Sequence, residues 1–145
     1  MISTAVTTKT HTPDELRELI RAAQADPCVD AFHRLWYACR TTVWMTRWRG
    51  VPMMKCPFDL QVYHELLIDL RPDLVIETGT AWGQTAEAIG QALAANGHGR
   101  LASIEPDGER AAYSRERCAG LPVDILERES LSFVPTGPVG LLFSD

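Results

Sequence analysis

The sequence lacks the cysteine and histidine spacings that build metal sites or disulfide frameworks. Its four cysteines form no C-x-x-C pair, and its four histidines show no ligand spacing with them, so we expect reduced thiols in a cytoplasmic protein. No apolar run reaches the roughly 18 residues of a membrane-spanning helix, and the first residues lack the regions of a signal peptide. The formal net charge of −5 disfavours a polyanion partner. The composition therefore predicts a protein that binds neither nucleic acid nor membrane.

Two phosphate-binding signatures are also missing from the segment that follows the apolar run Leu74 to Ile76. Gly79 and Gly83 are the only glycines there, so the G-x-G-x-x-G fingerprint of dinucleotide-binding domains is incomplete. The P-loop needs a lysine directly after its second glycine, and none is present. These absences exclude a triphosphate site and disfavour a dehydrogenase-like nucleotide domain.

The same segment does contain an apolar strand, a glycine turn and an Ala-rich helix. Such a turn lets a ligand approach the backbone, and the free N–H groups at a helix start attract negative charge. A second acid, Glu105, closes the next apolar run, Leu101 to Ile104. This is the layout of a nucleotide-type cofactor site, with ribose hydroxyls on the second acid. The alternative is a purely structural strand-turn-helix with a tightly packed glycine.

Apolar runs and turn residues predict an α/β fold for the rest of the chain. The expected strands are Leu74–Ile76, Leu101–Glu105, Val123–Leu126 and Val139–Phe143. Helices between them predict a Rossmann-like doubly wound parallel sheet, in which the first and fourth strands are neighbours. The glycine and prolines within residues 49–57 predict an irregular segment, and Asp59 is expected to cap the helix that follows.

The first 57 residues are predicted to form an N-terminal helical extension and a lid-like segment. Thr12-Pro13-Asp14-Glu15 is a capping-box sequence with proline at the first helical position. A weaker helix is expected from Val29 to Ala38. Residues 58–145 are then the N-terminal part of the α/β domain.

Two sequence patterns carry a family resemblance. The string E-x-G-x-x-x-G-x-T from Glu77 to Thr85 resembles motif I of class I S-adenosylmethionine-dependent methyltransferases. Upstream, the run W-x-G-x-x-x-x-K-x-P-x-D-x-x-x-Y-x-E from Trp48 to Glu65, with E-T-G-T at Glu77, resembles the cephalosporin hydroxylase and rhamnosyl O-methyltransferase family. The resemblance covers residues 40–145. It implies methyl transfer from S-adenosyl-L-methionine to a hydroxyl of a sugar or natural-product scaffold, with Mg²⁺ assistance in the complete fold.

The resemblance also implies roles for particular residues. Gly79 and Gly83 give room to the methionine moiety, Thr85 donates to its carboxylate, and Glu105 accepts from the ribose. The remaining implied cofactor-binding residues are Glu77, Thr80 and Ser130, and the implied metal ligand is Asp145. No residue is identified as the catalytic base.

The fourth predicted strand runs directly into Asp145, although the family fold expects further strands. We therefore expect the N-terminal part of a methyltransferase domain, truncated after the fourth strand. Such a chain would be inactive alone, and would either form a homo-oligomer or depend on a missing C-terminal half. The alternative function is a non-catalytic half-domain that binds the cofactor or a partner chain.

Overall fold

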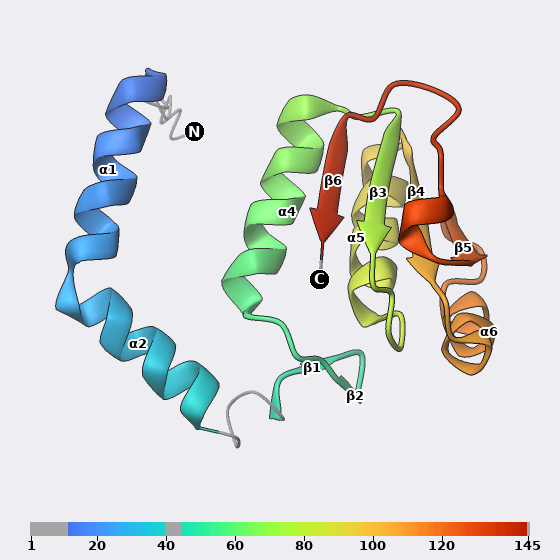
Figure 1. The fold of residues 1–145 in the computed structure, drawn as a ribbon, viewed down its shortest axis with the longest axis horizontal. Coiled ribbons are helices and arrows are strands. Elements are labelled where there is room, and N and C mark those ends of the chain that lie inside the picture. The colour runs from blue at the N-terminus through green and yellow to red at the C-terminus, as the bar shows by residue number, and fades with distance from the viewer. Residues whose placement is uncertain (1–11, 40–44, 145) are drawn as a thin grey trace, which may run out of the picture. The chain divides into compact units, whose positions relative to one another are not determined.

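The computed structural model describes residues 12–39 and 45–144. The chain forms two compact units, which divide between Thr42 and Val43 (Figure 1). Among the described residues, no helix is both long and apolar enough to cross a membrane.

The first unit contains two helices, α1 (Pro13–Ala25) and α2 (Pro27–Ala38). The predicted capping box is confirmed at α1, because Thr12 N–H donates to Glu15 at 2.7 Å and Glu15 N–H donates to Thr12 Oγ1 at 3.2 Å. Asp26 ends α1 and caps α2, where its carboxylate accepts from Cys28 N–H at 2.7 Å. Both helices therefore begin with side-chain caps that the sequence encodes locally.

The second unit begins with a short antiparallel hairpin and continues into a parallel sheet with its helices. The hairpin pairs β1 (Arg47–Trp48) with β2 (Val51–Pro52). The remaining elements are α4 (Pro57–Leu70), β3 (Leu74–Thr78), α5 (Gln84–Asn96), β4 (Arg100–Glu105), α6 (Gly108–Arg117), β5 (Val123–Glu127), the 3₁₀ turn η1 (Ser130–Ser132) and β6 (Leu141–Ser144).

The sheet is parallel, with strand order β5-β4-β3-β6. This confirms the predicted parallel α/β sheet, including the pairing of its first and fourth strands at Val75 and Leu141. The chain moves outward from β3 to β5 and then returns to the other side of β3. Open parallel sheets bind ligands outside the carboxyl ends of the strands at such a reversal.

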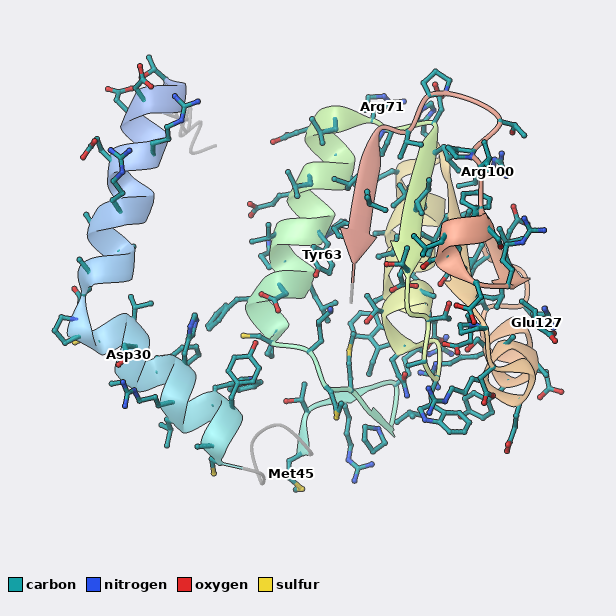
Figure 2. The ribbon with its side chains drawn as sticks, in the orientation of Figure 1. Asp30, Met45, Tyr63, Arg71, Arg100 and Glu127 are labelled. Atoms are coloured by element: carbon teal, nitrogen blue, oxygen red, sulfur yellow. The ribbon has the colours of Figure 1, made fainter. Side chains whose placement is uncertain are left out.

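Successive side chains of each strand point to opposite faces of the sheet, and they contribute to two apolar clusters, one on each face. On one face Val75 and Leu101 pack against α4, α5 and α6, mainly through Leu67, Ile89 and Leu93. Tyr63 of α4, labelled in Figure 2, reaches β6, where its ring centroid lies 4.2 Å from that of Phe143. The opposite face packs Leu74, Ile76, Ala102 and Ile104 against Leu126 and Phe133.

Two local expectations were wrong. Residues 49–57 are not irregular throughout, because Val51 pairs with Trp48 in the hairpin. The helix after this segment begins at Pro57 with Cys56 as its N-cap, so Asp59 lies inside the first turn. Proline suits the first helical position because it has no N–H to leave unpaired.

Candidate functional site

The turn after β3 is held against the end of β4 by backbone hydrogen bonds. Gly79 and Thr80 both donate to the carbonyl of Ile104, at 3.0 and 3.3 Å. Gly79, Ala81 and Gly83 have φ values of 84°, 50° and 77°, in the left-handed region that glycine enters at least cost. The turn therefore keeps the backbone close to the carboxyl edge of the sheet. It leads into α5 at Gly83, which supplies no side-chain cap.

A buried polar chain supports this turn from behind. Ser103 of β4 donates to Glu77, which is 1% exposed. The hydroxyls of Ser103 and Thr80 lie 2.5 Å apart. Because Ser103 has one hydroxyl proton and gives it to Glu77, Thr80 is the donor to Ser103 Oγ. Glu77 thus acts through Ser103 and Thr80 on the turn.

Glu105 joins the turns that follow β3 and β4. It is 3% exposed, and its two carboxylate oxygens accept from Ala81 N–H at 2.7 Å and Asp107 N–H at 3.1 Å. Each carboxylate oxygen has two lone pairs, so each keeps capacity for another donor. Glu105 is thereby fixed in place and still able to accept hydrogen bonds from a ligand.

Glu105 and the turn residues Gly79, Thr80 and Ala81 line a cavity of about 980 Å³ at the carboxyl edge of the sheet. One side of the cavity is aromatic and basic. The rings of Trp82 and Tyr113 pack edge to face with their centroids 5.6 Å apart. The Arg110 guanidinium lies 5.8 Å from the Trp82 ring centroid. The hairpin and the residues after it form another side. They contribute Val51, Pro52, Met53 and Met54.

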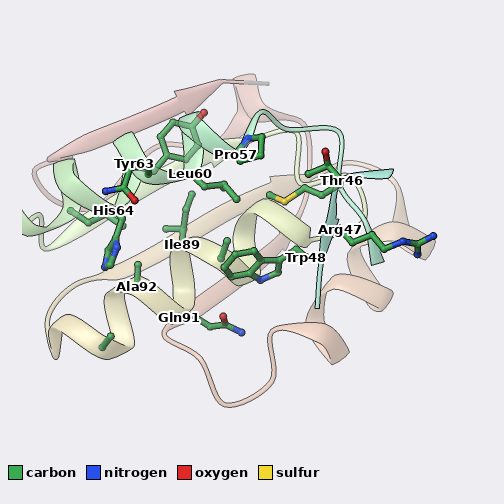
Figure 3. A pocket seen from close by; sticks show the side chains of 15 residues that line it. Thr46, Arg47, Trp48, Pro57, Leu60, Tyr63, His64, Ile89, Gln91 and Ala92 are labelled. Atoms are coloured by element: carbon green, nitrogen blue, oxygen red, sulfur yellow. The ribbon is translucent and has the colours of Figure 1, made fainter. Parts of the chain in front are cut away.

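A second cavity of about 530 Å³ lies along α4 and α5 (Figure 3). Trp48 of the hairpin lines this cavity together with Ile89 and Gln91 of α5, all labelled in Figure 3. Of the residues that the structure describes, Met53 alone lines both cavities, and it is 2% exposed. None of the residues predicted for the cofactor site lines this second space.

Four of the predicted cofactor residues come together around the large cavity: Gly79, Thr80, Thr85 and Glu105. Glu77 is buried behind the turn, and Gly83 faces Ser114 of α6 rather than the cavity. Ser130 lies in η1 and is exposed, away from the cavity lining. Asp145 lies outside the described residues. Within residues 12–39 and 45–144 no group of three or more His, Cys, Asp or Glu side chains could hold a metal ion.

The sequence reasoning missed the hairpin residues, the cluster of Trp82, Arg110 and Tyr113, and Ser103. An aromatic residue next to a motif glycine was an available signal for Trp82. The others depend on which helix faces and strands meet in three dimensions, which local patterns do not encode.

Comparison with known proteins decides the family. The family model described as Rhamnosyl O-methyltransferase/CmcI matches residues 40–130. The chain belongs to this family. A curated rhamnosyl O-methyltransferase from Mycobacterium leprae (strain TN) is 37% identical over 62 residues, which are 42% of this chain and 26% of that protein.

Solved structures of this family have the same fold. The cmcI-N160 SAH structure is 22% identical, with a TM-score of 0.56 over 69% of this chain and 52% of its own. The cmcI-D160 Mg-SAM structure is also 22% identical, with a TM-score of 0.55 over 70% and 46%. This chain thus spans about a quarter of the curated relative and about half of these structures. It has the fold of class I methyltransferases.

Proposed function

We propose that this chain carries the S-adenosylmethionine-binding part of an O-methyltransferase, whose acceptor is a hydroxyl of a sugar or natural-product scaffold. Membership of the family and the name of the curated relative support this proposal. The observation that carries it is Glu105, a fixed carboxylate with free acceptor capacity in the wall of the large cavity. When bound, S-adenosylmethionine supplies an electrophilic methyl group on its sulfonium.

The residues around the cavity fit such a cofactor. Glu105 accepts hydrogen bonds from the ribose hydroxyls, which are charge-assisted bonds and stronger than neutral ones. The uncapped start of α5, together with the Thr85 hydroxyl, binds the methionine carboxylate. Apolar side chains of the hairpin segment, such as Met53, cover the methionine chain and exclude water. Together these groups hold the cofactor at the carboxyl edge of the sheet.

Magnesium assistance, with Asp145 as a ligand, stays a prediction. The Mg-SAM complex of cmcI-D160 supports it for that relative. The described residues of this chain form no cluster that could hold a metal, so the proposal includes no step that passes through a metal ion. The second candidate function is a half-domain that binds the cofactor without catalysis. A labelled-methyl turnover assay with sugar acceptors separates the two.

The test is a calorimetric titration of Glu105→Gln with S-adenosylhomocysteine. Gln keeps one carbonyl oxygen for one of the two backbone donors and removes the negative charge that strengthens the ribose bonds. Because charge-assisted bonds contribute about 1.5–3 kcal/mol each, we expect affinity to fall about tenfold or more.

Glu127→Gln is the matched control. Glu127 ends β5 in register with Glu105 on β4, but it is half exposed, pairs with Arg115 at 3.4 Å and does not line the cavity. It should leave S-adenosylhomocysteine affinity unchanged. Equal affinities for the two variants would contradict the role of Glu105, and tighter binding of NAD than of S-adenosylhomocysteine would contradict the proposed cofactor.

A further inference from the structure

The hairpin that closes one side of the large cavity is too small to hold itself in place. It has two residues in each strand, and isolated two-stranded hairpins are marginal in water. Its turn places Arg49 at φ 47° and Gly50 at φ 84°, the backbone of a type I′ turn. A left-handed arginine is unfavourable without support. Contacts outside the hairpin must therefore favour this conformation.

A buried carboxylate on α5 provides that support. The Glu87 side chain is 4% exposed, and its two oxygens meet different arginines: Oε1 lies 3.0 Å from Arg49 Nη1, and Oε2 lies 2.5 Å from Arg117 Nη2. The Arg117 side chain comes from α6 and is 10% exposed. Its Nη2 also donates to the backbone carbonyl of Trp48 at 3.2 Å. One acid and one arginine thus tie the hairpin to two helices.

Burial makes the ion pair between Glu87 and Arg117 sensitive to substitution of either residue. A buried charge that loses its partner carries a large desolvation cost, so Glu87 and Arg117 stabilise the fold only together. Trp48 Nε1, Arg117 Nε and Glu87 Oε2 are buried without an aligned hydrogen-bond partner among the described residues, so Glu87 Oε2 meets Arg117 as a close ion pair rather than as an aligned hydrogen bond. The attraction between Glu87 and Arg117 therefore depends on the close approach of their charges, which a shift of either side chain would weaken.

The position of the hairpin determines whether the large cavity stays covered on the side that the hairpin forms. Val51 and Pro52 of β2 line the large cavity together with the glycine turn. Met53 follows them and separates the two cavities, and its N–H donates to the carbonyl of Thr46 at 2.8 Å. If the hairpin moves, the covering of the cavity moves with it.

We propose that Glu87 and Arg117 are positioning residues of the cofactor site: their ion pair holds the hairpin over the bound cofactor and sets how long it stays bound. This inference rests on the proposed function. Neither residue lines the cavity, so both act through the hairpin. Loss of the pair should therefore raise the dissociation rate of S-adenosylhomocysteine and leave its association rate nearly unchanged.

The decisive variant is the double substitution Glu87→Gln with Arg117→Met. Each single substitution leaves the remaining buried charge without its partner and should lower the thermal unfolding midpoint. The double variant, in which both side chains are neutral, should recover much of that loss. Stopped-flow measurements of the double variant should still give dissociation of S-adenosylhomocysteine about tenfold faster than wild type. Hydrogen exchange at the Met53 amide should accelerate as well. Wild-type dissociation in this variant would overturn the proposal.

Arg49→Ala is the second variant, because the Arg49 side chain is 66% exposed and the core does not depend on it. It removes one of the two arginine contacts to Glu87, and we expect dissociation of S-adenosylhomocysteine to be about threefold faster. If the double variant fails to fold, an unchanged dissociation rate of S-adenosylhomocysteine from the Arg49→Ala variant overturns the proposal. The control is Arg100→Gln with Asp124→Asn, an exposed pair at 3.0 Å between β4 and β5, which should keep the wild-type rate.

Failure of the inference and failure of the proposed function give different results. If the wild-type chain does not bind S-adenosylhomocysteine, the proposed function is wrong. Exchange at the Met53 amide in the double variant then still decides whether the ion pair holds the hairpin. If the wild type binds and the double variant matches it in both dissociation rate and exchange, only the inference is wrong.

Discussion

Cys118 illustrates how burial controls chemistry at a single residue. It follows α6, is 3% exposed and is a free thiol, whereas Cys28 in α2 is a free thiol at the surface. Burial, followed by the nearby carboxylates of Glu87 and Glu77, raises the pKa of the Cys118 thiol from 9.0 to about 11, and Arg117 opposes this. Since the thiolate is the reactive form, Cys118 is protected in the folded protein.

We expect iodoacetamide at pH 8 to label Cys28 and not Cys118, as measured by peptide mass spectrometry.

The raised pKa of Cys118 also predicts a pH dependence of stability. Between pH 9 and about 11 the thiol ionises in the unfolded chain but not in the folded one, so the free energy of unfolding should fall across this interval. Cys118→Ala should flatten that fall, and Cys28→Ala should not. Identical pH profiles for the two variants would contradict a buried neutral thiol.

At the scale of elements, the start of α5 depends on close contact with α6. Gly83 has φ 77°, and a Cβ placed there would lie 2.8 Å from Ser114 Oγ and 3.2 Å from Ser114 Cα. Gly120 has a similar φ of 82°, but a Cβ placed on Gly120 would have no neighbouring atom within 4 Å. The two glycines share a backbone conformation and differ in the space around them.

Gly83→Ala should therefore destabilise the protein more than Gly120→Ala. Both variants incur about 1–2 kcal/mol for alanine in the left-handed region. Only the first must also move a helix, which adds about 1–3 kcal/mol. Urea unfolding at pH 7 measures the difference directly. Equal losses would mean that α6 shifts without cost and that Gly83 serves the backbone conformation alone.

The elements that the sequence predicted are those with long apolar or helical patterns. The strands at Leu74 and Leu101 lie within runs that are buried on both faces, and such runs are recognisable without partners. The hairpin was missed because its turn is Arg-Gly rather than Asn-Gly, and its stability comes from Glu87 and Arg117, far away in sequence.

Gly79 was expected at the candidate site from the glycine motif and Glu105 as the acid that closes the second apolar run, and both line the large cavity. Glu77 was expected at the cofactor, although its strand parity places it on the same face as Val75, beneath the helices. The aromatic and hairpin sides of the cavity depend on tertiary packing. Local patterns carry no information about that packing.

At the scale of the whole molecule, β6 lies at one edge of the sheet among the described strands. It pairs with β3 on one side, and Leu142 on it is 59% exposed. Neither proline nor lysine lies within Leu141–Ser144, and these residues commonly protect edge strands from pairing with other chains. An apolar edge of this kind favours self-association.

We expect the chain to self-associate through β6, as measured by light scattering across a concentration series. Leu142→Lys should reduce the apparent mass, because a charge on an edge strand opposes pairing. Val134→Lys is the control, since Val134 is 77% exposed but lies in the loop before β6. A monodisperse wild-type monomer would contradict this prediction, as would equal effects of the two substitutions.

The position of β6 beside β3 also sets the order in which the sheet assembles. Val75 pairs with Leu101 across a short stretch of chain and with Leu141 across a much longer one. For a flexible chain the longer closure costs about 0.8 kcal/mol more in entropy, so β3, β4 and β5 associate first and β6 joins last. The pairing of β6 with β3 is consequently the last part of the sheet to form, and the first to separate when folding reverses.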